Sequence, residues 1–343
     1  MSFVEENLEN GRERIQTTCL VILSVVAVAF ALYWLRPVLV PFVLALFFFL
    51  IFQAMIDIHL KYLKTPVPVA VLSTVVISGL FITLIVVLIS TSFGQIAANT
   101  ASYQAKLKQL LNGPAAAFLL ERWNIDVYAM ARGSIDNISS QAGRLIGATA
   151  NAVLGVVSQG VIVFIFFLFM ILDSTKNKKT TGKIWKKSEL KIKKYIMAKF
   201  FISLLQGVIV GAILTAFRVD MAFMFGFFAF VLNFIPTFGP ILAGLLPLPV
   251  IMVAPGITPT SGVLAFALPA AVLFVIGNFI EPKAYGDVLR LRPIAILMAL
   301  IFWGMLWGVT GMFLAVPLTA VLVLIFEGIE ITKPVARFMA AGK

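Results

Sequence analysis

The sequence is poor in the residues that build most familiar active sites. Its 343 residues include one cysteine, Cys19, and one histidine, His59. A single cysteine excludes an internal disulfide framework, and a single histidine is too few for a histidine-based metal site. No window offers a nucleophile, a base and metal ligands together. We therefore expect no catalytic residue, no metal and no cofactor, and we do not expect an enzyme.

Charge is the second shortage. Charged residues make up 12% of the chain and hydrophobic residues 61%, with a mean hydropathy of +1.04, whereas soluble domains carry roughly 25% charged residues. The few charges form short clusters between long uncharged stretches, which is typical of a chain that crosses a bilayer repeatedly. We predict an all-α, polytopic membrane protein. The polar N-terminus lacks the order of a removable signal peptide, so the first span is expected to remain as an anchor.

A bilayer core about 30 Å thick requires about 20 apolar residues in a helix. The uncharged windows are Ile15–Leu35, Val38–Ile56, Val67–Phe93, Leu145–Leu172, Phe200–Phe217, Met221–Ile280 and Pro293–Phe326. The last two are much longer than one span and are interrupted by proline and glycine. We predict about eight membrane segments, some of them broken or re-entrant, and four parts of the chain: 1–93, a hydrophilic insert at 94–149, 150–199 with the fourth span, and a transport half at 200–343.

The insert 94–149 is predicted to be helical, because its apolar residues recur at helical spacings of three and four. These residues are Ile135, Ile138, Ala142 and Leu145. Gly113-Pro114 would divide the insert into two helices. Two interpretations remain open, an amphipathic pair on the outer membrane surface and an extracytoplasmic collar that packs against other subunits.

A lysine-rich segment, 173–199, holds most of the net charge of +12. Its ten lysines stand beside only Asp173 and Glu189, a balance of 10 − 2 = 8, and lie at positions 176, 178, 179, 183, 186, 187, 191, 193, 194 and 199. Such a cluster predicts the cytoplasmic side of the membrane and contact with anionic lipid headgroups rather than nucleic acid. Together with Arg12 and Arg14 before the first span, it places both termini in the cytoplasm.

Proline and glycine break the late apolar runs. Asn233–Pro240 interrupts one run, and Gly304, Gly308, Gly311 and Pro317 interrupt the other. A broken helix frees backbone groups that protein or a wet cavity must satisfy, and in transporters such helix ends bind the solute. We therefore interpret 200–343 as the transport half.

Two asparagines stand in similar surroundings within this half. The sequence around Asn233, Phe230–Pro236, weakly repeats that around Asn278, Phe274–Pro282. Paired, proline-interrupted segments indicate a transporter site, and the two amides would suit a small polyhydroxylated or cyclic solute. The alternative is that each amide holds a broken backbone end or a neighbouring helix.

Glu281 closes the long uncharged run, and an ionisable group at such depth indicates function. Its alternative role is a salt bridge to Lys283 or Arg290. The predicted substrate path comprises Gln206, Asn233, Pro236, Gly239, Asn278, Glu281, Pro282 and Gly286.

Several blocks in the last part of the chain form a recognisable series: Met221–Phe230, Asn233–Pro236 with Gly239, Gly277–Lys283 with Gly286, and Leu300–Gly304 with Gly308, Gly311 and Val316–Thr319. In order and spacing these blocks resemble the autoinducer-2 exporter family of bacterial membrane proteins. The resemblance implies a bacterial inner-membrane protein that exports the quorum-sensing signal or a related small molecule. It also implies a homo-oligomer, with the pentamer among its forms, and sodium or proton antiport in some members. The lysine-rich segment is denser than the family pattern.

Three functions remain open. The first is an exporter of a small polar solute. The second is a sodium/proton antiporter, which would depend on Glu281 because other carboxylates are scarce in the late runs. The third is a non-transporting scaffold, in which Gly304, Gly308 and Gly311 would serve close helix packing.

Overall fold

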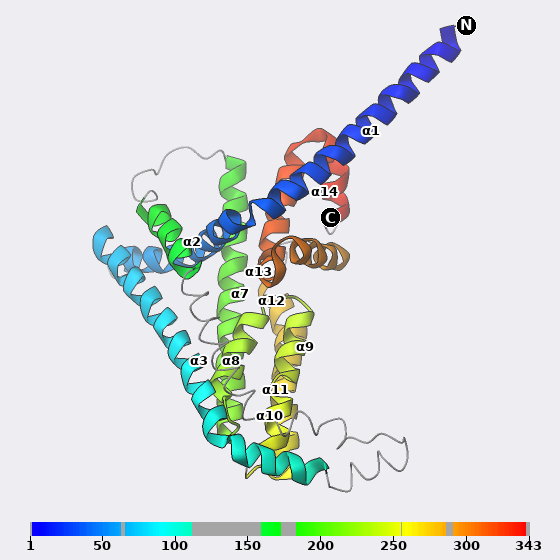
Figure 1. Cartoon of the computed structure of the whole chain (residues 1–343). Coiled ribbons are helices and arrows are strands. Elements are labelled where there is room, and N and C mark those ends of the chain that lie inside the picture. Colours follow the sequence, from blue (N-terminus) through cyan, green and yellow to red (C-terminus); the bar gives the residue numbers. More distant parts are fainter. Residues whose placement is uncertain are drawn as a thin grey trace, which may run out of the picture.

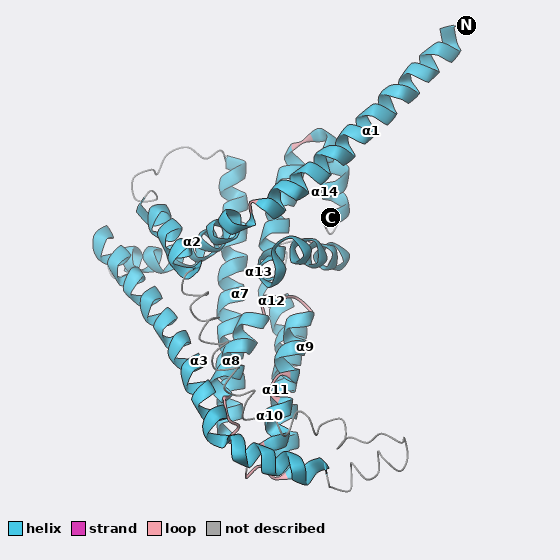
Figure 2. Ribbon diagram, viewed as in Figure 1, coloured by secondary structure: helices cyan, strands magenta, loops and turns pink. Residues whose placement is uncertain are grey.

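A computed structural model describes residues 2–62, 66–111, 159–172, 183–254, 256–285 and 291–340 of the chain (Figure 1). Within these ranges the regular structure is helical (Figure 2), apart from one isolated antiparallel bridge between Leu291 and Ala340. The predicted all-α class is confirmed. Among the described residues, six helices are long and apolar enough to cross a membrane. The predicted total of about eight membrane segments remains a prediction.

The helices follow the apolar windows with shifted ends. Their bounds are α1 Ser2–Trp34, α2 Arg36–Tyr62, α3 Val67–Leu111, an unlabelled helix Gln159–Leu172, α7 Lys183–Ala216, α8 Ala222–Leu232, α9 Phe238–Leu245, α10 Leu248–Val253, α11 Pro259–Val275, a π-helix Ile276–Ile280, α12 Glu281–Tyr285, α13 Pro293–Gly328, a 3₁₀ turn Glu330–Thr332 and α14 Lys333–Met339. Helix α3 continues beyond its apolar window into the predicted insert, whose remaining residues, with Gly113-Pro114 and the apolar stripe, lie outside the described ranges.

Helix α7 is the central element of the bundle, and it begins within the lysine-rich segment at Lys183. Its apolar stretch starts at Leu190, ten residues before the predicted Phe200. Helix α8 packs on it through glycines: a Cβ added to Gly207 would lie 2.7 Å from the carbonyl oxygen of Gly226, and the reverse holds for Gly226. Close backbone approach through small residues is how helices associate in lipid.

Helices α8 and α9 form a first hairpin, which turns at residues 233–237. Thr237 has a φ of 65° in this turn, a conformation rarely taken by β-branched residues. A Cβ on Gly239 would meet the carbonyl oxygen of Leu232 at 1.8 Å, so only glycine fits there. The predicted break at Asn233–Pro240 is therefore a tight reversal of the chain.

Helix α13 forms a second hairpin, because it breaks at Gly308, where φ is 64° and ψ is −143°. Trp303 Nε1 donates to Thr319 Oγ1 at 3.2 Å, although sixteen residues of straight helix would separate them by about 24 Å. The 36-residue helix is therefore folded back on itself rather than one straight span. Its start lies beside the end of α14, where the Arg292 N–H donates to the Met339 carbonyl at 3.0 Å.

The two hairpins meet through aromatic and apolar side chains. Phe234, in the first turn, stacks on Phe313 of α13 with ring centroids 4.4 Å apart, and Phe47 of α2 contacts both rings. Ile235 packs in a cluster with Trp303 and Trp307. This contact fixes the turn of the first hairpin, and with it Asn233, in the middle of the bundle.

Candidate functional site

One face of α7 carries three buried polar residues in an otherwise apolar stretch. Lys199, Ser203 and Gln206 are spaced by four and three residues, which places them on the same side of a helix. They face the turn of the first hairpin, where Asn233 is also buried, with 1% of its surface exposed. Polar side chains that are buried together in a membrane protein must form hydrogen bonds or ion pairs with one another, because neither lipid nor bulk water can supply the partners.

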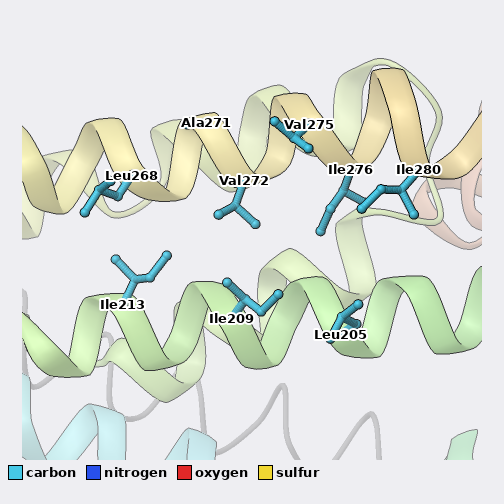
Figure 3. Close-up of a pocket in the computed structure, with 9 residues that line it drawn as sticks. All are labelled: Leu205, Ile209, Ile213, Leu268, Ala271, Val272, Val275, Ile276 and Ile280. Carbon is cyan, nitrogen blue, oxygen red and sulfur yellow. The ribbon is translucent and has the colours of Figure 1, made fainter.

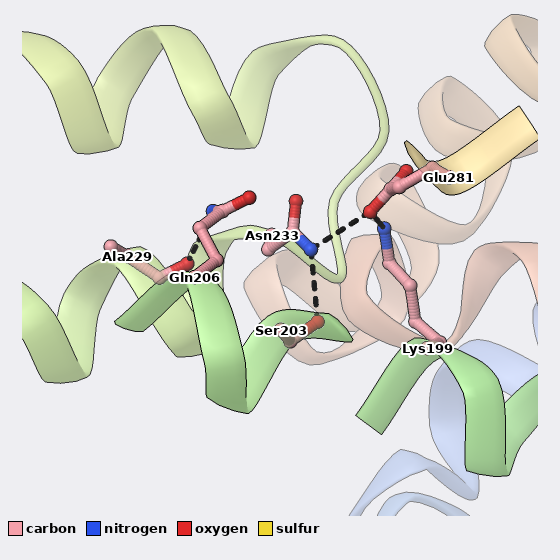
Figure 4. A network of polar contacts seen from close by, with 6 residues as sticks. All are labelled: Lys199, Ser203, Gln206, Ala229, Asn233 and Glu281. Carbon is pink, nitrogen blue, oxygen red and sulfur yellow. Dashed lines mark hydrogen bonds and ion pairs between the residues drawn. The ribbon is translucent and has the colours of Figure 1, made fainter. Parts of the chain in front are cut away.

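An ion pair and one amide connect these elements (Figure 4). Lys199 Nζ donates to Glu281 Oε1 at 2.6 Å, and Asn233 Nδ2 donates to the same oxygen at 2.8 Å. Asn233 Nδ2 also donates to Ser203 Oγ at 3.0 Å. The side chains of Lys199 and Glu281 are only 4% and 16% exposed. The pair therefore joins α7 to α12, and Asn233 joins the first hairpin to both.

Two amide oxygens in this cluster are buried acceptors with no hydrogen-bond partner among the described residues: Asn233 Oδ1 and Gln206 Oε1. These atoms must be the amide oxygens, because the other atom of each amide group faces a hydrogen-bond acceptor and must therefore be the nitrogen. Asn233 Nδ2 contacts a carboxylate, and Gln206 Nε2 donates to the Ala229 carbonyl at 3.1 Å, and both of these partners can only accept. The Asn233 backbone N–H donates to the same Ala229 oxygen at 3.2 Å, so the two residues are neighbours.

A π-helix presents Glu281 to this cluster. Pro282 has no N–H and clashes with the carbonyl four residues earlier, that of Asn278, so an α-helical bond cannot form there. The Glu281 N–H instead donates to the Ile276 carbonyl five residues back. Such π-turns are rare and occur frequently at functional sites. The local sequence thus explains why the helix widens directly before the carboxylate.

A cavity of about 610 Å³ lies between the first hairpin, α11 and the π-helix, and the polar cluster forms part of its wall. Lys199, Asn233, Asn278, Glu281 and Thr237 supply polar groups, and the rest of the lining is apolar or glycine. A second, apolar groove of about 350 Å³ lies between α7 and α11 (Figure 3). Helix α11 therefore has a polar cavity on one face and an apolar groove on another.

The structure brings half of the predicted substrate path together. Asn233, Pro236, Asn278 and Glu281 all line the polar cavity. Asn278 is exposed, and its Nδ2 donates to the Phe274 carbonyl of its own helix at 2.9 Å, which is the backbone-holding role left open above. The substrate-binding role of these residues remains a prediction.

The other predicted residues have different surroundings. Gln206 is fully buried and bonds to α8, Gly239 is required by the reversal of the chain, and Pro282 is exposed beside Glu281. Gly286 lies outside the described ranges. Glu281 pairs with Lys199 rather than with the Lys283 expected from sequence proximity, because the bundle brings α7 and α12 together. The other expected partner, Arg290, lies outside the described ranges.

Sequence reasoning missed Lys199 and Ser203. Lys199 was counted with the lysine-rich segment and given only a topological role. It is, however, the last lysine of that segment and is followed by the uncharged remainder of α7. Its helical spacing to Ser203 and Gln206 was the signal that could have separated it from the surface lysines.

Comparisons with known proteins indicate a family of transporters. The family model for AI-2E family transporters matches residues 22–330, and the chain therefore belongs to that family. It is 27% identical to the AI-2 transport protein TqsA of Escherichia coli K12 over 84% of this chain and 86% of TqsA. A Haemophilus influenzae protein described as a transport protein is 27% identical over 90% of this chain and 92% of its own length. The chain is thus a multi-pass membrane protein of a bacterial transporter family.

Proposed function

We propose that the protein exports a small, polar, uncharged molecule, the signal autoinducer-2 or a related metabolite, from the cytoplasm across the bacterial inner membrane. The observation that carries this proposal is the buried Asn233 Oδ1, an acceptor without a partner among the described residues, on a residue that lines the polar cavity. The name of TqsA supports the choice of autoinducer-2 as the first solute to test.

The chemistry of the cavity favours a neutral solute with several donors. Lys199 and Glu281 neutralise each other, so a charged solute would leave a net charge inside the membrane region. Both Asn233 amide hydrogens are already used, whereas its oxygen can still accept. This oxygen is buried in the structure, so a hydroxyl group of a small solute would donate to it once a shift of the turn opens it to the cavity, where Phe266 and Leu273 offer apolar surface to the carbon skeleton.

Efflux measurements test the proposal. Extracellular and intracellular autoinducer-2 are compared in cells with and without the protein, and then with Asn233→Ala and with Asn278→Ala. We expect Asn233→Ala to reduce efflux at least tenfold and Asn278→Ala to reduce it less, because the Asn278 amide bonds to its own helix. Ser261→Ala, at a half-buried position at the start of α11 that does not line the polar cavity, is the control. Unchanged efflux in Asn233→Ala at normal protein levels would remove the site assignment.

A sodium/proton antiporter is the second candidate, and the Lys199–Glu281 pair favours it. A buried carboxylate that is released from its ammonium partner could bind a proton or a cation during the cycle. The test is Glu281→Gln in reconstituted vesicles. Loss of pH-driven sodium flux supports antiport, and full retention of that flux removes Glu281 from any coupling step.

The proposal also covers the assembly of the protein, the orientation of its termini and its contact with lipid. We propose a homo-oligomer, with the pentamer as the first form to test, both termini in the cytoplasm, and anionic lipid at the lysine-rich segment 173–199, without nucleic-acid partners. Reporter fusions at both termini test the orientation. The mass of the detergent-solubilised complex and its retention of anionic lipid test the assembly and the lipid contact. A scaffold without transport would show normal assembly and no flux of any solute.

A further inference from the structure

The part of α3 that continues beyond its apolar window contacts the turn between α7 and α8 (Figure 1). Three polar residues on one face of this extension, Gln95, Asn99 and Tyr103, follow one another at intervals of four. Asn99 Nδ2 donates to Asp220 Oδ2 at 3.0 Å, and the Tyr103 hydroxyl donates to the same oxygen at 2.5 Å. We call these three residues, with Asp220 and the Met221 N–H, the α3 clamp.

Gln95 completes the clamp at the backbone. Its Oε1 accepts from the Met221 N–H at 2.7 Å. Met221 is the residue that precedes α8, and its own side chain provides no cap for that helix. A side chain of α3 therefore satisfies a backbone donor at the start of α8, which links the two elements directly.

The turn that the clamp holds is conformationally strained. Arg218 and Met221 have φ values of 56° and 60°, in the left-handed region that non-glycine residues rarely adopt. Such conformations persist where surrounding contacts hold them, and they cluster at switch regions. Here the hydrogen bonds from α3 fall on Asp220 and Met221, within this strained stretch.

The turn between α7 and α8 is held by two kinds of contact, close helix packing between α7 and α8 and hydrogen bonds from α3. Helices α7 and α8 approach so closely at Gly207 and Gly226 that a Cβ on either glycine would clash with the other helix. The clamp consists of hydrogen bonds to a partly buried carboxylate, which water could replace. A movement of the closely packed pair α7–α8 against α3 would shift Asn233, because α8 ends at this residue in the polar cavity.

The Tyr103 phenol keeps its proton at physiological pH. Burial raises its pKa above the ordinary value, and the hydrogen bond and the charge of Asp220 raise it further, while Asn99 acts in the opposite direction. Its hydroxyl therefore remains a donor to Asp220 throughout the range in which cells live.

We propose that the α3 clamp opens and closes during the transport cycle, and that it thereby sets the position of α8 and Asn233 relative to the rest of the bundle. This inference goes beyond the proposed function, because it holds for any solute that passes the cavity. Asp220 and its partners on α3 act as positioning residues and do not contact the solute.

Reversible cross-linking tests whether the clamp must open. Cys19 is the single native cysteine, so Cys19→Ser gives a clean background. Asn99→Cys and Asp220→Cys are introduced together and joined by a short, reducible bis-methanethiosulfonate reagent. We expect autoinducer-2 efflux to fall at least tenfold on cross-linking and to return on reduction, with no effect of the reagent on either single-cysteine variant. Full efflux from a cross-linked protein would overturn the proposal.

A second measurement does not depend on the solute. Met221→Cys in the Cys19→Ser background places a thiol at a buried position of the turn, and its labelling by a maleimide reports opening. Tyr103→Phe removes a hydrogen bond to a charged acceptor and should speed labelling roughly tenfold, whereas Tyr33→Phe on α1 should not. Equal labelling rates would show a static clamp. If the parent protein labels as expected but exports no autoinducer-2, the proposed function fails while the clamp stands.

Discussion

Helices α1 and α7 are similarly apolar, yet they stand in opposite surroundings within the chain. The window Ile15–Trp34 of α1 has a mean hydropathy of 2.3 and buries none of its residues, whereas Leu190–Ala216 of α7 has 2.0 and buries 44%. Lipid is as apolar as a leucine side chain, so apolarity gives two membrane helices little reason to associate. Hydropathy therefore identifies a span and does not indicate which spans pack together.

Small and polar residues account for the difference. Helix α7 carries Gly207 and Gly211 against α8, and Lys199, Ser203 and Gln206 toward the polar cavity, while the α1 window contains no glycine. Where α1 does attach, it uses a polar contact: Trp307 Nε1 donates to the Leu32 carbonyl at 3.0 Å. Substitutions that remove these features from one region and leave the other intact test this explanation.

The largest expected effect comes from the buried ion pair. Lys199→Met leaves Glu281 without its counter-charge and should lower the free energy of unfolding by about 3–5 kcal/mol. Lys191→Met, on the exposed side of the same helix, should change it by less than about 0.5 kcal/mol. Lys199→Met combined with Glu281→Gln should recover most of the loss. Thermal unfolding in detergent provides the comparison, and equal effects of the two lysine variants would contradict it.

Two glycine substitutions, one in the α7–α8 contact and one on an open face of α3, should change stability in opposite directions. A Cβ at Gly226 would lie 2.7 Å from the Gly207 carbonyl oxygen and 2.9 Å from the Gly211 Cα, so Gly226→Ala should cost about 1–3 kcal/mol through overpacking. Nothing lies within 4 Å of a Cβ at Gly79 in α3, where alanine should stabilise the helix by up to about 1 kcal/mol. Melting temperatures of both variants are the measurement. Destabilisation by Gly79→Ala would show that α3 is packed against a partner.

The smallest effect concerns the attachment of α1. Trp307→Phe keeps an aromatic ring in the cluster but removes the hydrogen bond to Leu32, which should cost about 0.5–1.5 kcal/mol. Faster proteolysis between α1 and α2 would report the loosened helix. Trp34→Phe, at a side chain that is 74% exposed, should leave the proteolysis rate unchanged, and equal rates for both variants would show that the Leu32 contact does not hold α1.

Sequence patterns predicted the local features of this protein and missed the pairings between distant segments. Apolar windows located the long helices, and Asn233–Pro240 and Gly308 located the breaks, because proline and glycine act on their own backbone. Glu281 was found as the charge that ends an uncharged run. Its partner Lys199 lies 82 positions away and has no local signal except its helical spacing to Ser203.

The α3 clamp shows the same limit. Asp220 lies between two uncharged windows of the sequence, and Asn99 lies in a segment expected to be a separate insert. They are 121 positions apart, and nothing in the composition of either segment indicates the other. Hydrogen bonds of this kind depend on how whole helices are placed, which is decided by packing rather than by periodicity.

The fold-back of α13 affects how the crossings of this chain are counted. Hydropathy alone scores Pro293–Gly328 as one passage from one compartment to the other. The Arg292 N–H, just before α13, donates to the Met339 carbonyl at the end of α14. The two ends of this stretch therefore lie side by side, and the stretch contributes an even number of membrane crossings. Tags attached just before α13 and just after α14 should therefore report the same compartment. A topology model that counts this stretch as one crossing would place every loop on the wrong side of the membrane when it is built from the C-terminal end.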